Sequence, residues 1–80
     1  MKVSVLLFAR YQEAAGSPHV EVEVADPVTL RAVWEAVRQR VPALGAEERP
    51  ILACNRAHAR PETAVRPGDE IAAFPPVSGG

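Results

Sequence analysis

The chain of 80 residues has few of the residue types that build catalytic and metal-binding sites. A single cysteine, Cys54, cannot form a disulfide or a cysteine-based metal cluster within one chain. His19 and His58 have no metal-ligating neighbours at a suitable spacing, so we expect no metal site. The serines lack the setting of a nucleophile elbow, and the five glycines form no phosphate-binding loop. The sequence therefore predicts neither a catalytic constellation nor a bound cofactor.

Long apolar runs and blocks of like charge are also missing. Nine basic and ten acidic residues are interspersed and give a formal net charge of −1, which argues against nucleic acid as the main partner. No run is long enough to cross a bilayer, and residues 3–9 lack the cleavage site of a signal peptide. We therefore expect a cytoplasmic protein that binds neither nucleic acid nor membranes. Hydrophobic residues make up 48% of the chain, which is enough for one small domain with a compact core.

Alternating apolar residues predict the strands. The expected strands are residues 3–9, 19–24, 51–55 and 70–74, with a short return strand at 57–60. The turn before the last of them, Arg66-Pro67-Gly68-Asp69, places proline and glycine where a type II turn requires them.

One long amphipathic helix is predicted in the middle of the chain. Apolar residues at helical spacing form one stripe there: Leu30, Val33, Trp34, Val37 and Val41. Asp26 or Thr29 is expected to cap this helix, and Pro42 to end it. A single helical turn is expected at residues 11–15, stopped by Gly16, and a loop at residues 43–50.

This order of elements favours an α+β fold. A mixed sheet of four to five strands, with the long helix packed on one face, is the simplest way to bury the apolar stripes. The first and last strands would then lie side by side in the sheet centre, which is the β-grasp (ubiquitin-like) arrangement. We expect one domain at residues 1–74 and a flexible C-terminal tail at residues 75–80.

The two central strands place apolar side chains on the face away from the helix. If the helix covers the side of Val3 and Ile71, alternation puts Leu6, Phe8 and Phe74 together on the open face. One interpretation is that a loop or the short helix covers them. The functional interpretation is a surface that docks a partner directly beside the start of the tail.

The tail combines two stiff residues with two that carry no side chain. Its residues are Pro75, Pro76, Val77, Ser78, Gly79 and Gly80. The prolines favour an extended conformation, and the glycines would pass through a slot that excludes ordinary side chains. The terminal carboxylate is ionised at neutral pH and becomes reactive only when another enzyme converts it to an acyl-adenylate with ATP. A frayed end or a cloning remnant is the alternative interpretation of the two glycines.

At these residues the chain resembles the small subunit of molybdopterin synthase, the MoaD family of sulfur carriers. The resemblance covers nearly the whole chain and is most specific at Pro67-Gly68-Asp69-Glu70-Ile71 and Phe74-Pro75-Pro76-Val77-Ser78-Gly79-Gly80. It implies that an E1-like enzyme adenylates Gly80 with ATP and magnesium, and that a sulfur donor protein converts Gly80 to a thiocarboxylate.

The resemblance also implies where the sulfur goes. Residues 75–79 would enter a pocket of the large synthase subunit, where two sulfurs convert cyclic pyranopterin monophosphate into molybdopterin. Leu6, Phe8 and Phe74 would dock the partner, in a heterotetramer of two small and two large subunits.

Three other functions fit the same residues. The chain is also consistent with a sulfur carrier for thiamine, cysteine or tRNA thiolation. A ubiquitin-like modifier would instead link Gly80 to lysines of other proteins. An interaction module with an inert tail would be unaffected by the loss of Gly80.

Overall fold

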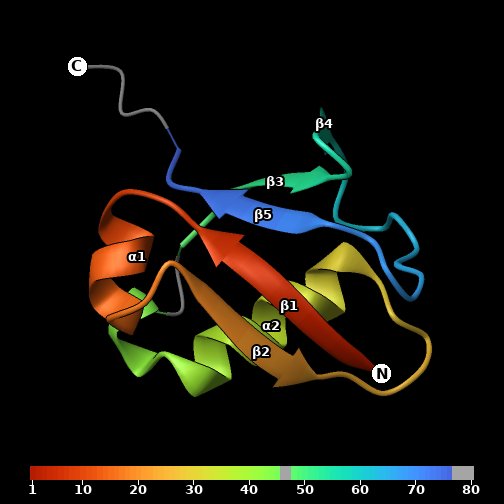
Figure 1. Ribbon diagram of the computed structural model, residues 1–80, viewed down its shortest axis with the longest axis horizontal. Coiled ribbons are helices and arrows are strands. Elements are labelled where there is room, and N and C mark those ends of the chain that lie inside the picture. Colours follow the sequence, from red (N-terminus) through yellow and green to blue (C-terminus); the bar gives the residue numbers. More distant parts are fainter. Residues whose placement is uncertain (46–47, 77–80) are drawn as a thin grey trace.

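The structure is a computed structural model that describes residues 1–45 and 48–76 (Figure 1). Its elements in chain order are β1 (Lys2–Leu7), α1 (Arg10–Ala15), β2 (His19–Glu23), α2 (Leu30–Arg40), the 3-10 helix η1 (Pro42–Leu44), β3 (Ile51–Cys54), β4 (Ala57–His58) and β5 (Ile71–Phe74). All five predicted strands and both predicted helices are present. The prediction of a loop at residues 43–50 was wrong in part, because Pro42 begins η1.

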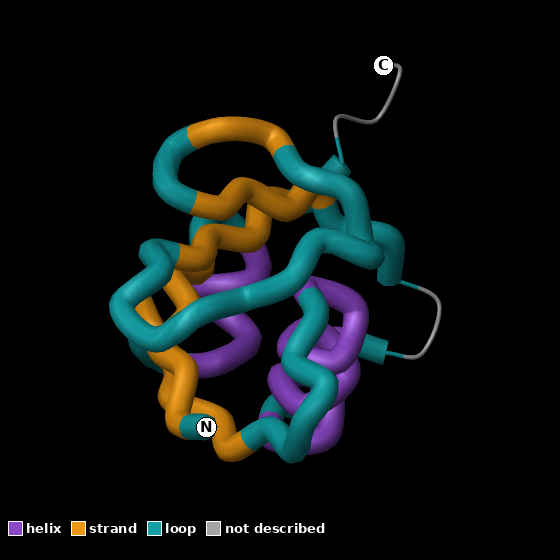
Figure 2. Tube along the Cα trace, turned by 90° about the vertical axis from the view of Figure 1, so that its right-hand side faces the viewer, coloured by secondary structure: helices purple, strands orange, loops and turns teal. Residues whose placement is uncertain are grey.

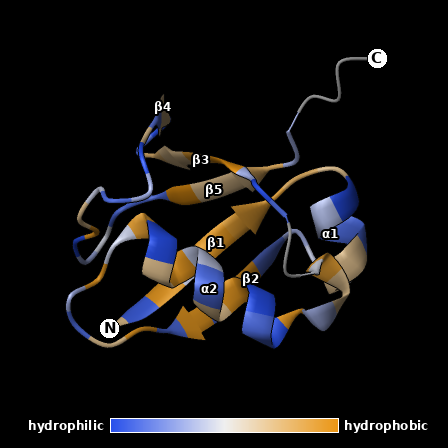
Figure 3. Cartoon of the chain, turned by 180° about the vertical axis from the view of Figure 1, so that it is seen from behind, coloured by the Kyte–Doolittle hydropathy of each residue, from blue (hydrophilic) through white to orange (hydrophobic). Residues whose placement is uncertain are grey.

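The strands form one mixed sheet in the order β2-β1-β5-β3-β4. β1 and β5 are parallel neighbours, whereas the β1–β2, β3–β5 and β3–β4 pairs are antiparallel. The first and last strands therefore lie side by side in the inner part of the sheet, as predicted. The helices lie to one side of the strands (Figure 2), and α2 crosses β1 and β2 on that side (Figure 3). This arrangement is the β-grasp fold.

The core lies between the sheet and α2. Its members alternate along the strands and follow the helical stripe; among them are Val3, Val5, Leu7, Val22, Leu30, Val33, Trp34, Val37, Val41, Ile71 and Ala73, all at most 7% exposed. All five residues of the predicted stripe are buried. Tyr11 anchors α1 to this core, because its ring lies 5.3 Å from that of Trp34.

Local hydrogen bonds explain where the helices begin and end. The Thr29 hydroxyl accepts from the Ala32 N–H at 3.2 Å, so Thr29 and not Asp26 is the N-cap of α2. The first-turn N–H groups of Leu30 and Arg31 donate to backbone carbonyls of the loop at residues 61–63. Gly16 ends α1 at a φ of 72°, in the left-handed conformation that glycine adopts without strain.

The turn before β5 is the one predicted. Gly68 has a φ of 89°, and the Asp69 N–H donates to the Arg66 carbonyl at 3.0 Å. β5 then runs to Phe74, and the structure describes only Pro75 and Pro76 of the expected tail. Val77, Ser78, Gly79 and Gly80 lie outside the described residues, so the flexibility of the tail stays a prediction. No helix in the described part of the chain is long and apolar enough to cross a membrane.

Candidate functional site

The face of the sheet opposite α2 carries a patch of apolar side chains. We call Leu6, Phe8 and Phe74 the open-face patch. Leu6 is 37% and Phe8 is 38% exposed. Among the described residues, no other large hydrophobic side chain is exposed to this extent. The rings of Phe8 and Phe74 stack with centroids 4.4 Å apart and an interplanar angle of 11°. The structure thus brings the three predicted residues together, and neither α1 nor a loop among residues 1–45 and 48–76 covers them.

Strand alternation and register explain how the patch forms. In the parallel pairing, Leu6 lies opposite Ala72 and Leu7 lies opposite Ala73. Leu7 and Ala73 point into the core, so their neighbours Leu6 and Ala72 point to the open face. The small side chain of Ala72 leaves space above the sheet between its larger neighbours.

Two adjoining hollows surround the patch. One, of about 470 Å³, is lined by Leu6, Phe8, Ala53, Arg56, His58, Glu70, Ala72 and Phe74. The other, of about 490 Å³, is lined by Phe8, Ala9, Ile51, His58, Phe74 and Pro75. Both share Phe8, His58 and Phe74, and the second extends to the first residue of the expected tail. A partner that fills these hollows would contact the patch and the start of the tail at once.

Charged and polar groups form the rim of the first hollow. Arg56 Nε donates to Glu70 Oε1 at 3.2 Å, which links the β3–β4 hairpin to β5. His58 projects from β4 beside this pair and lines both hollows. Arg56, His58 and Glu70 were not predicted from the sequence to belong to this site. The Asn55-Arg56 pair in the sequence indicates the tight hairpin that brings them together, because asparagine favours the positive φ of such turns.

A hydrogen-bond network fixes that hairpin. Asn55 and Arg56 have φ values of 54° and 70°, and they connect β3 to β4. The Asn55 side chain donates to Asp69 Oδ1 at 3.0 Å and accepts from the Glu70 N–H at 2.9 Å. The Arg66 N–H donates to Asp69 Oδ2 at 2.8 Å. This N–H and then Asn55 hold the pKa of Asp69 below its usual value, because both stabilise the carboxylate.

Cys54 lies next to this network but is poorly suited to react. Burial, and after it the nearby Asp69 carboxylate, raises the pKa of its thiol above the usual value. A raised pKa lowers the thiolate fraction at neutral pH, and the thiolate is the nucleophile. Cys54, the last residue of β3, therefore acts as a small strand residue and not as a nucleophile. The described residues contain no group of three histidine, cysteine or acidic side chains that would hold a metal ion.

Comparison with known proteins identifies relatives over nearly the full chain. The model of the ThiS family matches residues 5–80. A molybdopterin synthase sulfur carrier subunit of Haemophilus influenzae is 41% identical, over 98% of this chain and 99% of its own length. A subunit of the same name from Chlamydomonas reinhardtii is 32% identical over the whole of both chains. Among solved structures, small archaeal modifier protein 1 of Haloferax volcanii superposes with a TM-score of 0.84 and 32% identity, over 100% of both chains.

Proposed function

This chain belongs to the ThiS family, and from that membership we propose that it is the sulfur carrier subunit of a molybdopterin synthase. The observation that carries the proposal is the full-length match to relatives of that name, at up to 41% identity. The family match extends to Gly80, so the segment expected to carry sulfur is part of the likeness.

In this proposal the chain presents its C-terminus and its partners supply the catalysis. An E1-like enzyme uses ATP and magnesium to adenylate the Gly80 carboxylate. A sulfur donor protein then displaces the adenylate and leaves a thiocarboxylate on Gly80. The thiocarboxylate transfers its sulfur to cyclic pyranopterin monophosphate inside the large synthase subunit, with two small and two large subunits in the complex.

The open-face patch supports the docking step of this scheme. Phe74 belongs to the patch, and Pro75 is the next residue and lines the adjoining hollow. If the six residues from Pro75 to Gly80 adopt an extended conformation in the complex, at about 3.1 Å each they would reach roughly 20 Å from the domain. A large subunit docked on the patch would therefore receive Gly80 well inside its own pocket.

The test is reconstitution with a large synthase subunit and the pterin precursor. The chain carrying a chemically prepared thiocarboxylate at Gly80 should yield molybdopterin, with about two carriers consumed per product. A chain that lacks Gly80 should bind the large subunit and yield none. Glu35→Gln, on the exposed side of α2, should behave as the unchanged chain and serves as the control. Product formation by the chain without Gly80 would contradict the proposal.

A second candidate function is protein modification. It is favoured by the likeness to small archaeal modifier protein 1, which is as extensive as that to the sulfur carriers. Mass spectrometry of the protein purified from its own host separates the two. A thiocarboxylate mass at Gly80 supports the carrier, whereas Gly80 linked to lysines of many proteins supports the modifier.

A further inference from the structure

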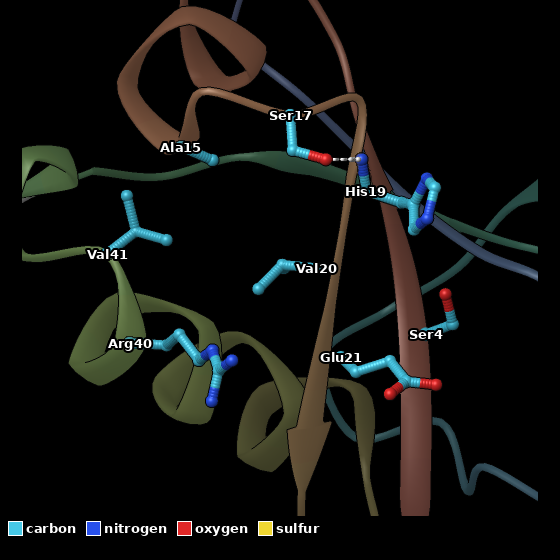
Figure 4. A pocket seen from close by; sticks show the side chains of 8 residues that line it. All are labelled: Ser4, Ala15, Ser17, His19, Val20, Glu21, Arg40 and Val41. Carbon is cyan, nitrogen blue, oxygen red and sulfur yellow. Dashed lines mark hydrogen bonds between the residues drawn. The ribbon is translucent and has the colours of Figure 1, made fainter.

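In the described part of the chain, the sheet has one long edge without a neighbouring strand. β2 ends the sheet on one side with five residues, whereas β4 ends it on the other with two. Backbone hydrogen bonds join Val24 to Met1 and Leu7 to Pro18, and they fix which β2 residues face β1. In an antiparallel ladder, residue pairs that exchange backbone hydrogen bonds alternate with pairs whose N–H and C=O groups point away from the neighbouring strand. The N–H and C=O groups of Glu21 and Glu23 and the C=O of His19 therefore point to the free edge. The outward N–H of His19 donates to the Ser17 hydroxyl at 3.4 Å (Figure 4), and this long bond would be exchanged for one to an added strand.

A groove follows this free edge on the outside of the molecule. Two hollows, of about 490 Å³ and 240 Å³, share Glu21 and Arg40. In Figure 4, Val20, Arg40 and Val41 lie on the helix side of β2, and Ser4 and Glu21 lie on the other side. An added extended strand would occupy this groove and pair with the free backbone groups.

The side chains along the edge are complementary to those of a second copy. Glu23 lies 3.4 Å from the Met1 amino group, whereas no ion pair with a described residue engages Glu21. His19 and Glu21 are two residues apart on the open side of β2 and are both exposed. A two-fold axis through Val20 would place each His19 opposite Glu21 of the second copy, where the imidazole N–H donates to the carboxylate.

The register with the axis at His19 sets the two His19 side chains opposite each other and loses the His19–Glu21 pair. Shifts toward the C-terminal end of β2 that use the same backbone groups place like charges together. A shift that centres the axis on Glu21 puts the two Glu21 carboxylates directly opposite each other, and the next shift pairs Glu21 with Glu23. Like charges in directly opposed positions destabilise a strand pair. Charge therefore favours the register with Val20 at the axis, which also brings the two partly buried Val20 side chains together on the helix side.

We propose that two copies of this chain associate through their β2 edges, antiparallel, with His19 of each copy opposite Glu21 of the other. The sheet then continues across both copies as ten strands, twice the five of one chain. Phe8 directly follows β1 and Phe74 ends β5, so neither lies on this edge and both stay available to other partners. The proposal does not depend on the function proposed above.

Sedimentation velocity of the full chain, from micromolar to millimolar concentration, tests the association. We expect a reversible monomer–dimer equilibrium. Glu21→Pro removes an outward N–H without touching the β1 ladder and should weaken the dimer by about tenfold or more. Glu21→Lys should weaken it by a similar factor, because it places a cation opposite each His19. Exchange of the two residues, His19→Glu with Glu21→His, should restore it.

Two controls keep the result interpretable. Glu35→Lys makes the same change of charge away from the edge and should leave the dimer unchanged. Circular dichroism of each variant should show the unchanged fold. A chain that stays monomeric at millimolar concentration overturns the proposal. The proposal is also overturned if Glu21→Pro and Glu21→Lys leave the dimer intact. It is overturned as well if the β2 edge binds only a different protein.

Discussion

Replacement of Phe8 by alanine separates docking from folding. Phe8 is 38% exposed and stacks on Phe74 at 4.4 Å, so the free protein uses only one face of its ring. Loss of such a stack and of partial burial should cost about 1–2 kcal/mol of folding free energy, less than the ~3–5 kcal/mol of a fully buried phenylalanine. In the proposed complex the partner covers the second face. Central aromatic residues of interfaces are worth about 2 kcal/mol or more, so the dissociation constant should rise by about 30-fold.

Titration calorimetry against the large synthase subunit measures this loss, and urea denaturation measures the change in stability. Val37→Ala is the matched control, because Val37 is 0% exposed and lies on α2, on the other side of the sheet. Its truncation should cost roughly 2 kcal/mol of folding free energy and leave the affinity unchanged at a temperature where the chain is folded.

Two results would refute this reasoning. If Phe8→Ala binds the large subunit as tightly as the unchanged chain, the open-face patch is not the docking surface. If Val37→Ala loses as much affinity as Phe8→Ala, the loss reflects stability and not contact.

Two further predictions concern titration. Burial raises the pKa of Tyr11, the one tyrosine of the chain, to about 12. In the unfolded chain the tyrosine pKa is about 10, so the folding stability should fall between about pH 10 and pH 12. The absorbance of tyrosinate should then rise only as the fold is lost. A tyrosinate midpoint at about pH 10 in the folded chain would contradict this. The lowered pKa of Asp69 means that its contribution is present above about pH 3.9 and is lost as the pH falls through its folded pKa. Asp69→Asn should therefore flatten the acid-unfolding curve followed by circular dichroism, and an unchanged curve would argue against it.

The sequence predicted those parts of the fold that depend on apolar periodicity. The stripe from Leu30 to Val41 is buried, and strand alternation placed Leu6 and Phe8 on the open face. These predictions succeed because one-sided burial requires the period of the element to match the period of its apolar residues. The sequence did not decide whether Asp26 or Thr29 caps α2, because both residue types are good N-caps. Only the path of the backbone places Thr29 at the first turn.

The rim of the site could not be predicted in the same way. Arg56, His58 and Glu70 come together because the Asn55-Arg56 turn folds β4 back along β3, and β3 pairs with β5. That turn lacks the glycine that usually marks such a hairpin, and the contact to Glu70 spans 14 residues. η1 was missed for a related reason, since Pro42 ends one helix and also suits the first position of the next.

The parallel pairing of β1 with β5 has a consequence for how the tail is delivered. It stacks Phe8, near the start of the chain, on Phe74, the last residue of β5. Pro75 follows without a spacer, and proline allows only a narrow range of φ. A partner that covers the Phe8–Phe74 stack therefore meets the tail at a fixed position, and the direction in which the tail leaves the sheet is set by the same strand that docks. In the proposed function, docking would therefore also position the start of the inserted segment, because Phe74 of the patch and Pro75 of the tail are consecutive residues.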